Sequence, residues 1–315
     1  MNIPHKQFCV LPWISLEASP IGTVRPCCLA QDEIVDGNSV KFNLNTADFD
    51  SIQNSEYMYQ LRQQFLAGKR PATCNRCWEE ERAGRTSKRM HTLDRLKHMG
   101  ISNEWTADAK PLMFLDLKLG NICNLKCRIC GSWSSSKWAS EEMDYLPKGA
   151  DKKSHIAYTW LKRGKWPEES PDFWENLKSL LPNIKYFEFT GGEPWMIQEH
   201  FELLEYAVEQ GYSKNIDIHY NTNATQWPTP HFNLWKEFGS QKLQLIVNHD
   251  KGSLVQLFLQ SSYHNIVKVQ LRGYHDMACH YSSGWYEGVP FGTYALDKLK
   301  KDYQDMADIW EKDYK

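Results

Sequence analysis

A chain of 315 residues is long enough to bury a full-sized hydrophobic core, as one large domain or as two smaller ones. Its 37 basic and 39 acidic side chains give a formal net charge of -2 and are spread along the sequence, so there is no basic field of the kind that nucleic acid or anionic lipid requires. The amino terminus lacks the apolar segment of a signal peptide, and no run approaches the ~20 apolar residues that span a bilayer. We therefore expect no nucleic-acid partner, no membrane and a cytoplasmic location.

The cysteines are the first chemical signal along the chain. There are nine, an odd number, and most of them fall in tight sets or pairs. This usage fits metal ligation in a reducing compartment better than a disulfide framework. The first third of the chain holds Cys9, Cys27, Cys28, Cys74 and Cys77.

The segment up to about residue 110 is expected to be β-rich. Gly22 to Cys27 is typical of one limb of a β-hairpin, and Gly37-Asn38 marks a further turn before the segment from Val40 to Leu44. One helix interrupts this pattern, beginning after the N-cap residue Ser55 and ending at Gly68. Its apolar residues at helical spacing are Met58, Leu61 and Phe65.

A CxxC pair, Cys74 and Cys77, follows this helix. Glu80, Gly84, Ser87 and Arg89, in the charged stretch beyond it, are interpreted as a solvated helix face. With Cys9 and one of the two adjacent cysteines, the pair supplies four thiolates, which suffice for one closed iron–sulfur cluster. A structural zinc ion is the alternative, because CxxC pairs hold zinc very often.

The central feature of the sequence is a loop that packs three thiols into a short span. The segment from Leu112 to Leu119 alternates apolar and polar residues and predicts a strand, with Cys123, Cys127 and Cys130 on the loop beyond Gly120. The carboxyl ends of strands are where α/β sheets and barrels place their chemistry. Three thiolates leave one iron of a cubane iron–sulfur cluster without a protein ligand, and an open metal position is typical of a catalytic site.

From this strand onward, short apolar strands alternate with helical patterns, which predicts βα units around a parallel sheet. The expected strands are residues 112–119, 184–190, 216–221, 243–248 and 266–271. Helices are expected from Ser170-Pro171, from about Ile197 to Gly211, and over residues 296–310. A sixth strand is not evident, because Pro290 makes residues 286–291 a poor candidate.

Polar residues follow three of these strands. Gly191 and Gly192 would let the backbone approach a ligand closely, and Glu193 offers a carboxylate to a ligand's ammonium group. Asn221-Thr222-Asn223 ends the next strand, and Asn248-His249-Asp250 ends the one after it. For these asparagine and aspartate side chains, capping of a local turn is as good an explanation as contact with a ligand.

The CxxxCxxC spacing of Cys123, Cys127 and Cys130, followed after the next strand by the Gly-Gly-Glu motif, resembles the radical S-adenosylmethionine (radical SAM) family. The resemblance implies a partial (β/α)6 barrel and a 4Fe-4S cluster whose open iron chelates SAM. It also implies that Gly191, Gly192 and Glu193 bind the methionine part of SAM.

Further contacts to SAM follow from the same resemblance. The backbone at Ile129 would meet the adenine, and Asn223 and Asn248 would lie near the ribose. Two departures from the family's pattern bear on the ribose: Ala224 replaces a frequent glycine, and Asn248 stands where serine is frequent.

The first third of the chain resembles a second module, the twitch domain, which is the shorter relative of the SPASM domain. The resemblance rests on Cys9, on the Gly22-x4-Cys27 spacing and on the later CxxC pair. It implies one auxiliary 4Fe-4S cluster on Cys9, Cys27, Cys74 and Cys77, although Cys28 keeps the choice of the fourth ligand open. The expected domains are residues 1–110 for this module and 111–315 for a radical SAM core with a shortened or open carboxyl-terminal part.

Together these resemblances imply a radical SAM oxidoreductase or maturase. SAM would be cleaved to a 5'-deoxyadenosyl radical that takes hydrogen from a peptide or small-molecule substrate, such as a protein side chain or a sugar-like alcohol. The auxiliary cluster would relay electrons, and flavodoxin or ferredoxin would be the electron donor. The rival hypothesis is a non-catalytic protein, either zinc-stabilised or an iron–sulfur electron carrier with a degenerate barrel.

Overall fold

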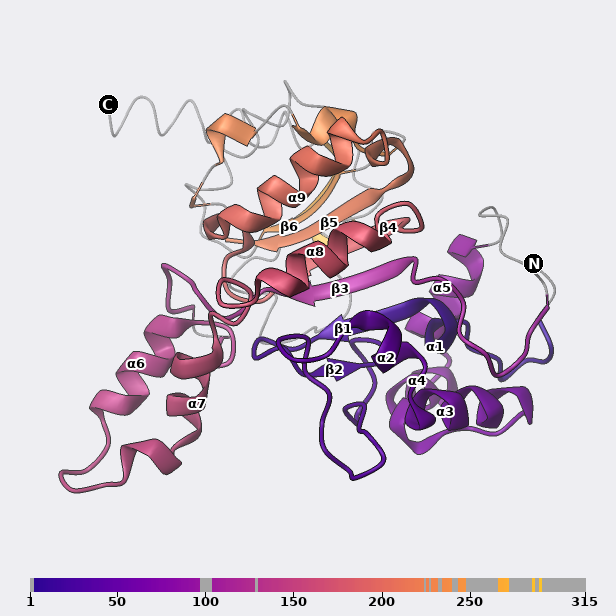
Figure 1. The fold of residues 1–315 in the computed structure, drawn as a ribbon, viewed down its shortest axis with the longest axis horizontal. Coiled ribbons are helices and arrows are strands. Elements are labelled where there is room, and N and C mark those ends of the chain that lie inside the picture. The colour runs from indigo at the N-terminus through magenta and orange to yellow at the C-terminus, as the bar shows by residue number, and fades with distance from the viewer. Residues whose placement is uncertain are drawn as a thin grey trace.

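The fold is mixed α/β and is built on one sheet (Figure 1). The structure, a computed structural model, describes residues 3–96, 104–127 and 130–223, and beyond them 225–226, 228–231, 234–239, 243–247, 266–271, 285–286 and 289–290. The strands of the main sheet are β1 (Ser15–Ala18), β2 (Val24–Arg25), β3 (Phe114–Lys118), β4 (Tyr186–Thr190), β5 (Asp217–Thr222), β6 (Leu243–Val247) and β7 (Ile266–Leu271).

The sheet has seven strands in the order β2-β1-β3-β4-β5-β6-β7. Every neighbouring pair is parallel except β1 with β2, which is antiparallel. The five strands expected from the sequence are therefore confirmed as β3 to β7. β8 (Trp285–Tyr286) and β9 (Val289–Pro290) form a separate two-stranded sheet among the described residues, and the partial (β/α)6 barrel stays a prediction.

The amino-terminal strands are part of this same sheet. Ser15 to Ala18 of β1 pair in parallel with Phe114 to Leu117 of β3, so the sheet crosses the expected domain boundary at residue 110. The hairpin limb before Cys27 is confirmed as β2. The expectation of a β-rich module is wrong, because most of the regular structure described between residues 3 and 96 is helical.

The helices show where local sequence signals were sufficient. Ser55 caps α3 by accepting a hydrogen bond from the backbone N–H of Met58, and α8 begins at Pro171, both as expected. The α-helices are α1 (Leu11–Ile14), α2 (Phe49–Gln53), α3 (Glu56–Leu66), α4 (Asn75–Arg82), α5 (Lys88–Leu96), α6 (Ser136–Asp144), α7 (Ile156–Arg163), α8 (Pro171–Leu180) and α9 (Gln198–Glu209). The 3-10 helices are η1 (Ala72–Cys74), η2 (Lys152–Ser154), η3 (Pro194–Met196), η4 (Ser213–Asn215), η5 (Thr229–His231) and η6 (Leu234–Glu237). Residues 296–310 lie outside the described residues. In the part of the chain that the structure describes, no helix is long and apolar enough to cross a membrane.

The two faces of the sheet differ in polarity. One face is apolar, and α8 and α9 lie across it (Figure 1). Its buried side chains are Leu115, Leu117, Phe187, Phe189, Ile218 and Tyr220. The opposite face carries a row of polar residues paired in register: Glu17, Asp116, Glu188 and His219. α6 and α7 pack on each other and project away from the sheet as an arm (Figure 1).

Candidate functional site

The three-cysteine loop leaves the carboxyl end of β3 and is held by Asn121. The backbone N–H of Asn121 donates to the carbonyl of Gly164 (3.0 Å), its buried side chain donates to the carbonyl of Ser132 (2.8 Å), and its own carbonyl accepts from Ser136 (2.7 Å). Gly120 has a φ of 106°, and a Cβ there would lie 2.0 Å from the Gly164 oxygen. The loop is thereby fastened at both of its ends.

The three thiols of this loop are half-buried and act on one another. The hydrogen bond with Cys127, burial and the charges of Cys127 and Cys123 raise the pKa of Cys130 above its usual value. Burial is the main cause that raises the pKa of Cys123. Ile129, expected to meet the adenine, lies outside the described residues.

Gly191 and Gly192 pack directly against this loop. Their φ angles are 77° and 58°, and a Cβ on Gly192 would lie 2.3 Å from the carbonyl oxygen of Ile122. The N–H of Glu193 donates to that same oxygen (2.7 Å). The close approach that requires glycine here is an approach to the cysteine loop itself, and contact with SAM stays a prediction.

Glu193 is fully buried and joins the end of β4 to the end of β5. One carboxylate oxygen accepts from the hydroxyl of Thr222 (2.6 Å) and the N–H of Trp195 (3.2 Å), and the other accepts from the N–H of Asn223 (2.6 Å). Burial raises the pKa of Glu193 to about 7 although these donors act against it. Among the described residues, no Lys, Arg or His forms an ion pair with it, so these three hydrogen-bond donors alone act on the buried carboxylate in favour of its charged form, and contact with a ligand's ammonium group stays a prediction.

Asn223 connects β5 to the cysteine loop. Its side-chain nitrogen donates to Asn124 Oδ1 (2.9 Å) and lies 3.5 Å from the sulfur of Cys123, while its Oδ1 accepts from the backbone N–H of Thr225 (2.9 Å). The turn-capping interpretation therefore describes one of its contacts, and the ribose contact stays a prediction. Asn248 lies outside the described residues.

The four amino-terminal thiols converge from separate elements. Cys9 precedes α1, Cys27 follows β2, Cys74 ends η1 and Cys77 lies in α4. Burial, followed by the charges of Cys74 and Cys27 and then of Cys77, raises the pKa of Cys9 well above its usual value. Backbone N–H groups of Leu29 and Ala30 act on Cys27, and that of Arg89 acts on Cys77, in the direction that favours thiolates.

Cys28 points away from this group. Its sulfur accepts a hydrogen bond from Lys88 Nζ (2.8 Å), and after Lys88 the charges that act most on its pKa are those of Asp116 and Glu188. The limb is not extended at the two cysteines, because the strand ends at Arg25 and the N–H of Ala30 donates to the carbonyl of Cys27 in a turn (3.1 Å). The two thiols nonetheless point in different directions, which is what the choice of Cys27 over Cys28 as the fourth ligand requires. The identity of that ligand stays a prediction.

Charged residues that the sequence did not predict link β2 and β3, the strands that precede Cys27 and the three-cysteine loop. Glu17 on β1 is 0 % exposed and pairs with Arg25 on β2 (2.7 Å) and with Lys118 on β3. Burial lowers the pKa of Lys118, but the charges of Asp116 and Glu17 outweigh it and raise this pKa above its usual value. The sequence held one signal for this charge network: two charged residues, Asp116 and Lys118, stand at alternate positions of a strand that is otherwise apolar.

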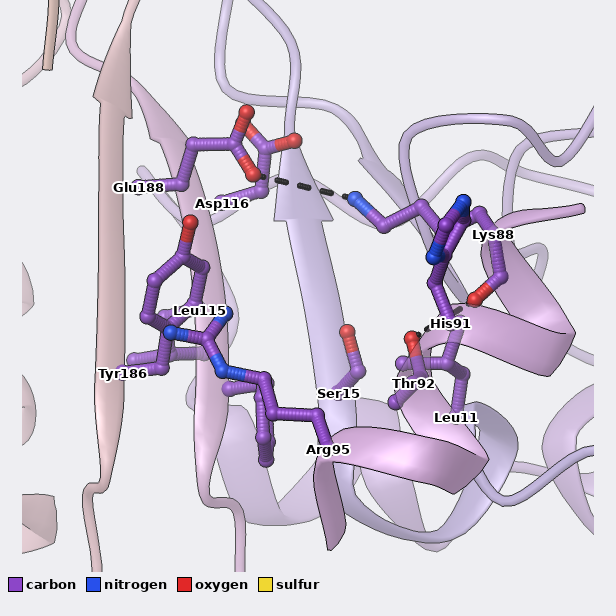
Figure 2. A pocket seen from close by; sticks show the side chains of 11 residues that line it. Leu11, Ser15, Lys88, His91, Thr92, Arg95, Leu115, Asp116, Tyr186 and Glu188 are labelled. Atoms are coloured by element: carbon purple, nitrogen blue, oxygen red, sulfur yellow. Dashed lines mark hydrogen bonds and ion pairs between the residues drawn. The ribbon is translucent and has the colours of Figure 1, made fainter. Parts of the chain in front are cut away.

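A cavity of about 160 Å³ lies on this polar face, between α5 and strands β3 and β4. Figure 2 shows Lys88 reaching from α5 toward Glu188, with the two charged groups 3.7 Å apart, and Arg95 beside Tyr186. The Arg95 guanidinium lies 4.1 Å from the centre of that ring. α5 therefore covers the polar face with cations.

A larger pocket, of about 790 Å³, is lined by residues of the amino-terminal segment and by residues near the three-cysteine loop, and is named the pocket between the thiol sites, although no thiol lines it. One side is formed by Gly191 and by Trp133, three residues after Cys130, and the other by Gln31 and Asp32. Both of these last residues donate backbone N–H groups to Thr73, the neighbour of Cys74 (2.9 and 3.0 Å). The lining of the pocket thus includes residues that neighbour each of the two thiol sets.

The comparison with protein families now bears on the amino-terminal thiols. Residues 9–78 match SPASM, an iron-sulfur cluster-binding domain. The match spans all four thiols, from Cys9 to one residue beyond Cys77, and so supports iron–sulfur binding at this end of the chain. SPASM domains are typical of radical SAM enzymes, whereas the preference for the shorter twitch form stays a prediction. No curated protein and no solved structure is significantly similar to the chain.

The donor sets fit iron–sulfur clusters in kind. Both are composed of thiols, and in each set neighbouring sulfurs act on one another's pKa. In the part of the chain that the structure describes, no three His, Cys, Asp or Glu side chains are grouped as one metal ion would need. A cubane takes each thiolate on a different iron, so that its ligands are spread around the cluster.

Proposed function

We propose that the chain is a radical SAM enzyme with an amino-terminal auxiliary cluster. Bound to Cys123, Cys127 and Cys130, a 4Fe-4S cluster with one open iron would supply the electron that cleaves SAM into methionine and a 5'-deoxyadenosyl radical, which takes hydrogen from the substrate. Cys9, Cys27, Cys74 and Cys77 would hold a closed cluster for electron relay.

The observation that carries the proposal is the meeting of three motifs that are far apart in sequence. The cysteine loop, the Gly-Gly-Glu loop and Asn223 follow β3, β4 and β5, which are neighbours in the sheet. Direct hydrogen bonds join them, from the Glu193 N–H to Ile122 and from the Asn223 side chain to Asn124. A structural site for a closed metal centre would not need this support from two further strands.

The roles of the residues follow from these contacts. Asn121 and the glycine pair fix the loop, so the three thiols are presented from a rigid base. Glu193 supplies a buried negative charge for an ammonium group, and Asn223 orients the end of β5 beside Cys123. These groups bind and orient, while the cofactor carries the difficult chemistry.

The pocket between the thiol sites is the proposed substrate site. Its volume lies in the range of ligand pockets, which is about 300 to 1,000 Å³. Arg25 and Lys118 line it as cations already held in place by buried Glu17, and Trp133, at 52 % exposed, presents an aromatic ring. A polar or charged substrate group beside an apolar one would suit this lining, which admits a peptide side chain as well as a sugar-like alcohol.

Anaerobic purification of the full chain tests the proposal. Iron and sulfide analysis should give about eight irons per chain by the arithmetic of two cubanes. Reduction with dithionite in the presence of SAM should yield 5'-deoxyadenosine. A protein that holds zinc and no iron would overturn the proposal, and a protein with both clusters that never cleaves SAM would support the non-catalytic electron carrier.

A further inference from the structure

A broad groove of about 940 Å³ lies on the surface formed by α4, α5 and the first residues of the chain. Its rim includes the exposed apolar side chains of Ile3 and Met90, and its floor includes buried Trp78. It is separate from the pocket between the thiol sites, which has different lining residues.

The groove is basic in a chain that is acidic overall. Its lining holds four cations, Lys6, Arg70, Arg85 and Arg89, against two acids, Glu81 and Asp94, a net charge of +2, whereas the whole chain has -2. Lys6, Arg70 and Arg85 line the groove, are exposed, and form no ion pair within the described residues. Of the acids in the groove, Glu81 is held by Arg89 through two hydrogen bonds of 2.9 and 2.7 Å. The groove therefore presents positive charge that the chain itself does not neutralise.

Two residues that line the groove adjoin the four-thiol site. Arg89 acts on the sulfur of Cys77 through its backbone N–H and donates from its side chain to the carbonyls of Lys6 and Phe8. Trp78 follows Cys77 in α4, and its ring lies 5.2 Å from the Arg89 guanidinium. This corrects the solvated helix face expected for Glu80, Gly84, Ser87 and Arg89 at two of the four residues: Ser87 is 0 % exposed and Arg89 is 6 % exposed. Arg89 therefore both lines the groove and contacts Cys77 through its backbone N–H.

We propose that this groove is the docking surface for an acidic one-electron carrier protein. The proposal rests on the iron–sulfur group of the proposed function, which gives such a carrier a reason to dock beside Cys77. The carrier loses one electron and the group gains it, with no bond made or broken. Opposite charge brings the two surfaces together and aligns them, while Ile3 and Met90 supply apolar contact.

The test measures binding, which is independent of catalysis. The full chain is titrated with an acidic plant-type [2Fe-2S] ferredoxin at 50 and 200 mM salt. We expect the dissociation constant to rise roughly tenfold at the higher salt, and by a similar factor for Arg70→Glu or Arg85→Glu at the lower salt. The matched control is Lys148→Glu, which makes the same charge change at an exposed lysine that does not line the groove and has no ion pair among the described residues. Circular dichroism checks that each variant is folded.

Three results would overturn the docking surface. The first is that Lys148→Glu weakens ferredoxin binding as much as the arginine variants do. The second is that neither Arg70→Glu nor Arg85→Glu changes the affinity. The third is that parvalbumin, an acidic protein without a redox group, binds as tightly as ferredoxin. Iron analysis of the same samples separates this outcome from a failure of the proposed function. Iron present with charge-insensitive binding refutes the groove alone, and iron absent refutes the proposed function.

Discussion

The two thiol sites differ in how they are enclosed. Three of the four amino-terminal thiols, those of Cys9, Cys27 and Cys77, are less than 10 % exposed, whereas Cys123, Cys127 and Cys130 are all half-buried. The first site gathers its thiols from four separate elements, and the second takes all of them from one loop supported by neighbouring strands. A site closed on all sides suits electron relay or structural support, and one that is open on a side suits a ligand.

The largest effect is expected from removing the open site. Replacing Cys123, Cys127 and Cys130 together by Ala should abolish formation of 5'-deoxyadenosine and lower iron from about eight to about four per chain, because the two ligand sets are separate. Iron analysis and product formation under dithionite measure this. Loss of all iron from a folded triple variant would show that the two sites are not independent.

The closed site is tested by its two adjacent cysteines. Cys27→Ala should lower iron by about four per chain, since the charge of Cys27 acts on Cys9 and Cys74. Cys28→Ala, the matched control, should leave iron unchanged and remove only the hydrogen bond from Lys88. The opposite pattern would exchange the roles of the two residues.

The link between the sites is tested at Glu17. Glu17→Gln leaves Arg25 without its buried partner and Lys118 with Asp116 alone, so the free energy of unfolding should fall by about 3 kcal/mol. Lys41→Met, which breaks the exposed pair with Glu33, should cost less than about 1 kcal/mol. Urea unfolding of both variants measures these two losses in the free energy of unfolding. Equal losses would show that the buried ion pairs of Glu17 stabilise the strands no more than the exposed pair does.

The smallest expected effect tells whether Glu193 binds SAM or only accepts hydrogen bonds within the protein. If its carboxylate binds the SAM ammonium, Glu193→Gln should weaken SAM binding by ~1.5 to 3 kcal/mol and leave the iron content unchanged. Glu188→Gln makes the same charge change on the polar face of β4 and should leave SAM affinity as it was. Unchanged affinity in the Glu193 variant would leave Glu193 with only the hydrogen bonds it accepts from Thr222, Trp195 and Asn223.

The sequence was sufficient where the signal is local. Alternation in residues 112–119 and the apolar runs of the later strands predicted β3 to β7, and the Ser55 cap predicted α3. β1 was missed although its residues alternate polar and apolar side chains, because it is only four residues long and is defined by pairing with β3. The contact between Cys28 and Lys88 was missed for the same reason, since only the folded chain brings together residues so far apart in sequence.

The parallel pairing of β1 with β3 sets an order of events during synthesis. Ser15 finds its partner only when Phe114 has left the ribosome, so the first module cannot complete its sheet while it emerges. Until then, one edge of β1 carries unpaired backbone groups of the kind that recruit strands from other chains. Pairing so distant in sequence also pays its loop-closure entropy late, which slows folding. The protein therefore depends on β3 to complete its first module, and a fragment that ends before residue 114 is expected to aggregate.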